Sequence, residues 1–246
     1  MRHSSLLSSA VLLAAVVLSG CNQPNNSTGP PGNLLQSPGA VGLGSIYTNG
    51  NNFRILAGST VANTGLTTVN GDVGVWAGTS VTGFGPGTMS ANGGLPHAGD
   101  VVAQAAQSDL TVAYNNAAAR PTGASVAGNL GGQTLTPGVY TSGSSLEISS
   151  GDLTLDARGN SNAVFIFQIP SALTVTSGRR VILSGGARAI NVFWQVGSSA
   201  TLGTTSDFSG TILANTSISL LTGARLHGRA LARTGAVTTD AAIIGI

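Results

Sequence analysis

Lysine is absent from this sequence, and charged residues of every kind are scarce. Only 7% of the 246 residues are charged, and all ten Lys+Arg positions are arginine, whereas an ordinary domain carries about 25% charged residues. The formal net charge is +2, and Arg179 and Arg180 form the one adjacent basic pair. Nucleic-acid recognition requires clustered basic side chains. The composition therefore argues against a nucleic-acid partner.

Cysteine and histidine are nearly absent as well. Cys21 is the one cysteine, so no disulfide can form within the chain. His97 and His227 are the only histidines after the first twenty residues, and a metal site would need further ligands beside them. We expect no metal and no cofactor, and we expect His97 to lie at the start of a helix.

Acidic residues are too scattered for an active site. A carbohydrate lyase would need clustered carboxylates for calcium and a basic catalytic residue. Asp72, Asp152, Asp156 and Asp207 instead lie apart, each in a Gly- or Ser/Thr-rich setting typical of turns. No nucleophile-elbow motif is present. We therefore expect that the protein is not an enzyme.

The first 20 residues have the pattern of an export signal. A short basic start precedes an apolar run over residues 10–18, which is too short to span a membrane as a helix. The run ends in Leu-Ser-Gly-Cys21, which resembles a bacterial lipobox. The alternative is an ordinary signal peptide with an incidental cysteine. Asn22, by resemblance to Gram-negative lipoproteins, favours the outer membrane.

We therefore expect residues 1–20 to be a lipoprotein signal peptide and Cys21 to be lipidated. The protein would be exported and anchored to a membrane at the cell surface, in the outer membrane, or else secreted. Residues 21–41 are rich in Asn, Pro, Gly and Ser, a composition typical of a flexible tether. Residues 42–246 would form one domain, which we expect to be a monomer.

The domain is predicted to consist mostly of short β-strands. Strand-like runs alternate with Gly, Asn, Ser or Thr corners, beginning with residues 53–57, 60–62, 67–70, 72–75 and 80–82. None of these runs is longer than about six residues, a length typical of strands.

Residues 97–120 break this rule and predict one long helix, at about 98–119. Apolar residues recur there at steps of three and four; they are Val102, Ala105, Ala106, Leu110, Ala113, Tyr114 and Ala117. Asp100 would lie in the first turn, where a carboxylate suits the helix dipole, and Pro121 would end the helix. Because the apolar face is made of small residues, we expect it to pack closely on a sheet.

Two pairs of segments resemble each other. Residues 165–169 (FIFQI) are echoed 27 positions later by residues 192–196 (VFWQV), and residues 210–213 are echoed 18 positions later by residues 228–231. Self-similarity at such periods indicates a solenoid, and strand-only units indicate a β-helix. A β-sandwich is the alternative.

The segment 192–203 shows the unit of this repeat. A strongly apolar strand (VFWQV) is followed by a glycine corner and then by a lighter strand, in which small polar and apolar residues alternate. We expect Phe193 and Trp194 to be packing residues and Gln195 to turn a corner.

Strings that match a known family run through almost the whole domain. They are residues 52–61 (NFRILAGSTV), 70–75 (NGDVGV), 97–100 (HAGD), 109–115 (DLTVAYN), 131–140 (GGQTLTPGVY), 153–157 (LTLDA), 162–168 (NAVFIFQ), 191–203 (NVFWQVGSSATLG) and 228–233 (GRALAR). In this order they resemble the ice-binding-protein-like family of secreted microbial proteins. The resemblance implies an all-β solenoid, namely a right-handed three-faced β-helix with one long helix packed along it, and ice as the binding partner.

The lighter strands supply the candidate ice-binding residues. Leu, Ile and Val would point inward and leave small hydroxyl side chains outward at Ser145, Ser149, Thr174, Thr176, Ser199, Thr201, Ser217, Ser219 and Thr238. Alternate residues of a strand lie about 6.5–7 Å apart and neighbouring strands about 4.7–4.9 Å apart, so these groups would form a regular grid that can order water. Glu147, Leu221 and Asp240 would interrupt it. Because Ser and Thr also simply suit exposed strands, the alternative is a cell-surface adhesin or a structural β-helix module without ice activity.

Overall fold

The computed structural model describes residues 52–85, 94–126 and 128–245. The expected signal peptide, the lipidated Cys21 and the expected tether lie outside the described residues. Within the described ranges, no helix has both the length and the apolarity that crossing a membrane requires.

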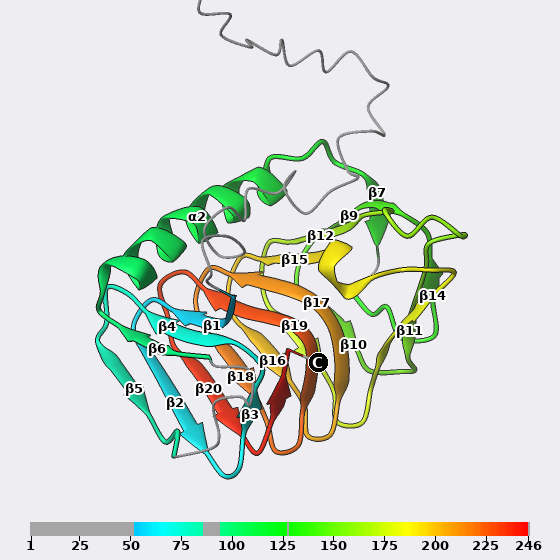
Figure 1. Ribbon diagram of the computed structural model, residues 1–246. Helices are drawn as coiled ribbons and strands as arrows, with labels where there is room; N and C mark the ends of the chain where they lie inside the picture. The colour runs from blue at the N-terminus through cyan, green and yellow to red at the C-terminus, as the bar shows by residue number, and fades with distance from the viewer. Residues whose placement is uncertain (1–51, 86–93, 127, 246) are drawn as a thin grey trace, which may run out of the picture.

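Short strands in three sheets make up most of the described chain (Figure 1). The large sheet has eleven strands, in the order β6 (Pro96–Ala98), β4 (Asp72–Val75), β1 (Phe53–Ala57), β19 (Arg225–Ala232), β17 (Asp207–Ala214), β15 (Val192–Val196), β12 (Phe165–Ile169), β9 (Gly138–Ser142) and β7 (Ala124–Val126), with β21 (Ile243–Ile244) pairing β19 and β3 (Thr68–Val69). The seven-stranded sheet has the order β10 (Leu146–Ile148), β13 (Leu173–Val175), β16 (Ala200–Leu202), β18 (Ile218–Leu220), β20 (Val237–Asp240), β2 (Thr60–Thr64) and β5 (Ser80–Thr82). The three-stranded sheet contains β14 (Val181–Ser184), β11 (Leu153–Asp156) and β8 (Thr134–Leu135).

The strands pair in parallel, and the predicted mostly β fold is confirmed. The predicted echoes are neighbouring strands in register: Gln168 lies opposite Gln195, and Gly210 lies opposite Gly228. A β-sandwich is built from antiparallel sheets, so that alternative is wrong.

The two ends of the described chain meet within the sheets. β1 pairs with β19, and β2 pairs with β20, so the first strands lie beside the last ones, as the cyan and red strands in Figure 1 show. The strands β4 and β6 extend the large sheet beyond this junction, and the helix α2 (Val101–Ala118) then leads the chain back toward β7 at the opposite edge. At 1.5 Å per residue its 18 residues span about 27 Å.

α2 confirms the predicted helix and its packing on a sheet, with corrections at its start. Asp100 is the N-cap rather than a first-turn residue, and its Oδ1 accepts a hydrogen bond from the Ala103 amide at 2.8 Å. His97 does not begin the helix either: it lies in β6, and its Nδ1 is 2.7 Å from the Asp100 Oδ2. Four of the predicted apolar residues are buried, namely Ala106, Leu110, Ala113 and Ala117. The buried face also includes Ala103 and Gln107, whereas the predicted Ala105 is exposed.

Replacing Asp100 by alanine is expected to destabilise the protein by about 0.5–2 kcal/mol, the usual cost of losing an N-cap. Burial tends to raise the pKa of Asp100, but hydrogen bonds from the Ala103 amide and His97 outweigh it and lower that pKa below its ordinary value of 3.8. A carboxylate whose pKa is lowered by folding contributes stability above its unfolded pKa and loses it as pH falls through the folded value. Urea unfolding should therefore show a difference between wild type and Asp100→Ala at pH 7 that shrinks below pH 3.8; an equal difference at both pH values would contradict this role.

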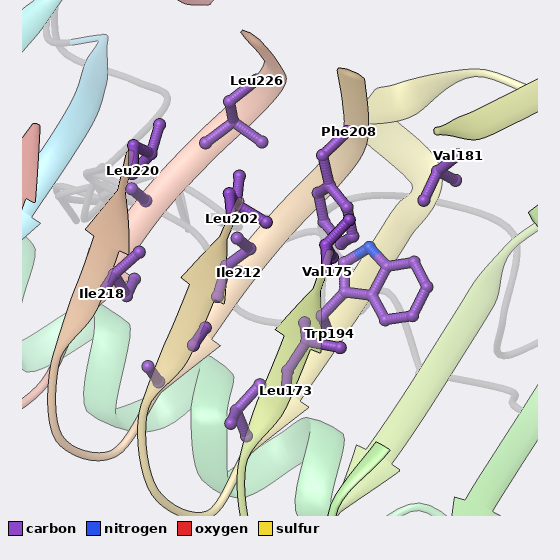
Figure 2. Close-up of a cluster of buried hydrophobic side chains, with 14 of the residues drawn as sticks. Leu173, Val175, Val181, Trp194, Leu202, Phe208, Ile212, Ile218, Leu220 and Leu226 are labelled. Carbon is purple, nitrogen blue, oxygen red and sulfur yellow. The ribbon is translucent and has the colours of Figure 1, made fainter. Parts of the chain in front are cut away.

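The core lies between the three sheets. Trp194 is fully buried there and stacks on Phe167, with ring centroids 3.8 Å apart, and the centroid of the Phe208 ring lies 4.9 Å from that of Trp194. Figure 2 shows Trp194 and Phe208 among the leucine, isoleucine and valine side chains that the seven-stranded sheet directs inward. A second layer, which includes Phe193, separates the large sheet from α2. The predicted packing roles of Phe193 and Trp194 are confirmed.

The prediction that Gln195 turns a corner is wrong. Gln195 is the fourth residue of β15, lies opposite Gln168 and is 6% exposed. The strand continues through it because Val196 still packs in the core, so the corner comes only afterwards, at Gly197.

Candidate functional site

The outer faces of the three sheets differ in breadth and in what covers them. α2 packs on the large sheet through a layer of buried apolar residues. The three-stranded sheet is narrow, and Ile182 projects from it, 40% exposed. The seven-stranded sheet therefore offers the broadest face that no helix of the described chain covers.

Each strand of the seven-stranded sheet alternates buried and outward residues. Leu173 and Val175 lie in the core on either side of the exposed Thr174, and Ala200 and Leu202 do the same around Thr201. Large apolar side chains are drawn inward because their burial releases water, so the residue between them has to face out. The alternation predicted from the sequence is confirmed for these strands.

The outward residues of the seven strands lie in register and form what we call the central row. Its members, from β10 to β5, are Glu147, Thr174, Thr201, Ser219, Thr238, Ala62 and Thr82.

A second row, the upstream row, lies two residues earlier along the chain, within β2 and β5 and directly before the other five strands. Its members, in the same order, are Ser145, Ala172, Ser199, Ser217, Ala236, Thr60 and Ser80. Backbone hydrogen bonds continue the register here, for example from the Leu173 amide to the Ser199 carbonyl at 3.1 Å. Of the fourteen positions in the two rows, ten carry a hydroxyl, three are alanine and Glu147 alone is charged.

Glu147 interrupts this surface less than its sequence position suggested. It is exposed and central within its own strand, but β10 is an edge strand, so Glu147 lies at the end of the central row. The six positions beyond it form an uninterrupted row of small, uncharged side chains.

The row two residues further along each strand, the downstream row, is irregular. It contains Ser149, Thr176, Gly203, Leu221, Asp240, Thr64 and Phe84. The Ser149 hydroxyl accepts a hydrogen bond from Asn129 Nδ2 at 2.6 Å, and the Thr176 hydroxyl donates to the Ile148 carbonyl at 3.2 Å. Seven of the nine predicted residues thus gather in the central and upstream rows, while Ser149 and Thr176 lie in this less regular one.

Several hydroxyls of the two regular rows are oriented by neighbouring strands. Thr238 Oγ1 donates to Ser219 Oγ at 3.1 Å, and Ser217 Oγ accepts from the Ala236 amide at 3.2 Å. A hydroxyl has one donor and two acceptor sites, so each retains capacity for water. Thr174 and Thr201 make no side-chain hydrogen bond to another described residue, which leaves their hydroxyls to solvent.

Three of the four scattered carboxylates accept hydrogen bonds from backbone amides, and the fourth pairs with a histidine. Asp72 accepts from the Asn52 amide at 2.7 Å, Asp152 from the Arg180 amide at 3.0 Å and Asp156 from the Arg158 amide at 2.9 Å. Asp207 pairs with His227 at 2.8 Å. Across the described ranges, no group of three or more His, Cys, Asp or Glu side chains could hold a metal ion.

Sequence reasoning missed six members of the regular rows. Ala172 and Ala236 belong to strands that it had identified as part of the face, whereas Thr60, Ala62, Ser80 and Thr82 belong to two strands that it had not joined to it. It identified strands at both places but did not join them to the others, which lie far along the chain. A signal was available, since Thr60-Val61-Ala62 and Ser80-Val81-Thr82 repeat the small–apolar–small pattern of Ser199-Ala200-Thr201. The pairing of β2 with β20 makes these residues part of one surface.

These features define a class of protein: a mostly β fold of parallel strands in which a broad sheet face, uncovered by any described helix, carries mainly small hydroxyl side chains. The model of the ice-binding-like family matches residues 55–245. The chain belongs to this family.

Individual relatives agree with this assignment. An ice-binding protein of Nostoc sp. (strain HG1) is 48% identical over 198 residues, which are 80% of this chain and 72% of that protein. The crystal structure of an ice-binding protein from an Antarctic biological consortium is 52% identical, with a TM-score of 0.78 over 83% of this chain and 90% of that one. The ice-binding protein of the Antarctic ascomycete Antarctomyces psychrotrophicus is 39% identical, with a TM-score of 0.75 over 85% of this chain and 97% of its own.

Proposed function

We propose that this protein binds ice through the central and upstream rows of the seven-stranded sheet, and that it thereby inhibits ice growth or recrystallisation. The observation that carries the proposal is the register of the seven outward residues from Glu147 to Thr82, six of which are small and uncharged. Membership of the ice-binding-like family supports it.

Such a surface can order a layer of water before the protein contacts ice. Positions along each row are about 4.7–4.9 Å apart and the two rows are about 6.5–7 Å apart, so hydroxyls and threonine methyls repeat in two dimensions. The methyl groups favour caged water and the hydroxyls anchor it, whereas charges would hold water in competing orientations. The ordered layer then merges with the ice surface.

Adsorption converts this recognition into an effect on freezing. Ice can grow only between the adsorbed molecules, where its front becomes curved, and a curved front melts at a lower temperature than a flat one. The protein needs no catalytic group for this, and the names of its relatives indicate binding proteins rather than enzymes.

The proposal also covers the handedness of the fold, the monomeric state and the attachment of the protein to the cell. The three sheets form a right-handed, three-faced β-helix that acts as a monomer. Residues 1–20 direct export, Cys21 carries the lipid anchor at the outer membrane or cell surface, and residues 21–41 let the domain reach ice away from that membrane. Without lipidation, the same chain would be secreted.

Thermal hysteresis and ice-crystal shaping of the purified protein test the function itself. We expect faceted crystals and a gap between the melting and freezing temperatures that grows with protein concentration. Round crystals and no gap at high micromolar concentration would contradict ice binding and would favour an adhesin that uses the same face for another partner.

A further inference from the structure

The outer face of the large sheet changes from apolar to polar near the C-terminal end of α2. In one row of this sheet, β1, β19 and β17 carry Leu56, Leu231 and Leu213, all buried against the helix. The next two strands carry Gln195 and Gln168 at the positions in register with these leucines. An apolar row thus becomes polar over two strands.

Gln168 has a structural role that accounts for its side chain. Its Nε2 donates to the carbonyls of Ala117 at 3.0 Å and Arg120 at 2.9 Å, and its Oε1 accepts from the Thr141 hydroxyl at 2.8 Å. The last carbonyls of a helix have no partner within the helix. Gln168 therefore supplies a hydrogen-bond donor to these carbonyls and fixes the end of α2 over β12.

Gln195 has no such partner. It is 6% exposed, yet its side-chain amide makes no hydrogen bond to another described residue. Its amide is not among the fully buried side-chain atoms that lack a partner, so the small exposed part of Gln195 leaves the amide open where the residue borders the surface. Leu213 occupies the same row on the adjacent strand, so a glutamine here places an amide at the surface where the next strand has a leucine.

The Gln195 side chain borders a cleft of about 620 Å³ at the C-terminal end of α2. The lining of this cleft also includes Tyr114, Arg120, Thr141, Gln168 and Pro170. The Tyr114 ring is held from one side by Arg233, whose guanidinium carbon lies 4.5 Å from the ring centroid. The lining contains an aromatic ring, a cation, amides and hydroxyls, and no carboxylate.

We propose that this cleft binds a saccharide of one or two sugar units, with acidic sugars preferred. Sugar hydroxyls both donate and accept hydrogen bonds, which matches the two donors and one acceptor group of the Gln195 amide. The apolar face of a sugar ring can pack on Tyr114 and Pro170. The volume lies within the range of about 300–1,000 Å³ that is usual for small-molecule sites. Arg120 donates through Nε to Asn116 Oδ1 at 3.1 Å, and its positive charge on the lining favours a uronate.

This site is separate from the proposed ice-binding surface. Its lining comes from α2 and from strands of the large sheet, while the central and upstream rows belong to the seven-stranded sheet. A molecule bound through the cleft to an acidic polysaccharide would keep its hydroxyl rows free, so the protein could hold ice next to a polysaccharide matrix.

Calorimetric titration of the purified full-length chain with oligogalacturonate and with malto-oligosaccharide tests the proposal. We expect both to bind, the acidic sugar more tightly. Gln195→Leu, which continues the leucine row, should weaken both affinities at least about tenfold, equivalent to about 1.4 kcal/mol, without lowering the melting temperature. Arg120→Gln should remove the preference for the acidic sugar, while Arg188→Gln, an exposed arginine outside the cleft, should preserve it.

Absence of heat with both sugars at millimolar concentration would overturn the proposal, and so would unchanged affinity in Gln195→Leu. If Gln195→Leu does not fold, Arg120→Gln decides the question, since equal preference in this variant and in Arg188→Gln would place the acidic sugar elsewhere. Thermal hysteresis of Arg120→Gln should equal that of the wild type, which separates failure of this site from failure of ice binding.

Discussion

Replacing Thr201 by tyrosine is expected to reduce thermal hysteresis about tenfold, because Thr201 lies within the row of small side chains that we propose to contact ice. Thr201 lies in the central row between Thr174 and Ser219. A tyrosine ring there would stand above the small neighbouring side chains and hold the surface away from ice, so the ordered water layer could not form over several positions. The fold should persist, because tyrosine suits exposed strand positions.

Thr154→Tyr is the matched control for this substitution. Thr154 is also a partly exposed strand threonine, but it lies in β11 of the three-stranded sheet, opposite Thr134 and Ile182. We expect its thermal hysteresis to equal that of the wild type. Equal losses in both variants would indicate a general effect of tyrosine, and a loss confined to Thr154→Tyr would move the ice-binding surface to the three-stranded sheet.

Replacing Trp194 by alanine is expected to destabilise the protein by about 3–5 kcal/mol, the usual cost of emptying a large aromatic site in a core. The indole stacks on Phe167, lies 4.9 Å from Phe208 and donates through Nε1 to the Ser209 carbonyl at 3.0 Å. Its loss leaves both a cavity and an unpaired buried carbonyl. Urea unfolding at pH 7 measures the change.

Val112→Ala provides the comparison for Trp194→Ala. Val112 lies on α2 but is 55% exposed, so its replacement should change the free energy of unfolding by no more than about 0.5 kcal/mol. A Trp194→Ala protein as stable as Val112→Ala would contradict the stacked aromatic core as a main source of stability.

Local alternation was enough to predict the strands of the functional face. The candidate residues in β13, β16 and β18 were found because each light strand alternates apolar and small polar residues. This period follows from the geometry of a strand with one buried face, so it is visible in a few consecutive residues. The two echoes at 27 and 18 positions were informative for the same reason, since paired strands in register bury equivalent residues.

Long-range pairing was not visible in the same way. The union of β2 with β20 joins residues about 175 positions apart, and part of it depends on a buried hydrogen bond from Thr239 Oγ1 to Asn63 Oδ1 at 2.8 Å. Nothing in the local pattern of either strand specifies its partner. Thr60 and Thr82 were therefore recognised as strand residues but not as part of the surface.

The burial of certain polar residues could not be predicted from the sequence either. Glutamine is a residue type that usually lies at corners or on the surface. Gln107 is nevertheless buried on the inner side of α2, and Gln195 is buried in β15. Gln107 is buried because its Nε2 donates to the Ala232 and Arg233 carbonyls at 3.0 and 2.7 Å. Such partners are set by the packing of the helix on the sheet, which composition and period do not encode.

Adsorption of fluorescently labelled protein to a single ice crystal would show directly whether the hydroxyl rows bind ice. We expect the wild type and Thr154→Tyr to be taken up on the same defined planes of the crystal, and Thr201→Tyr to remain in the liquid. Exclusion of the wild type from ice, or uptake of Thr201→Tyr equal to that of the wild type, would contradict adsorption through the hydroxyl rows of the seven-stranded sheet.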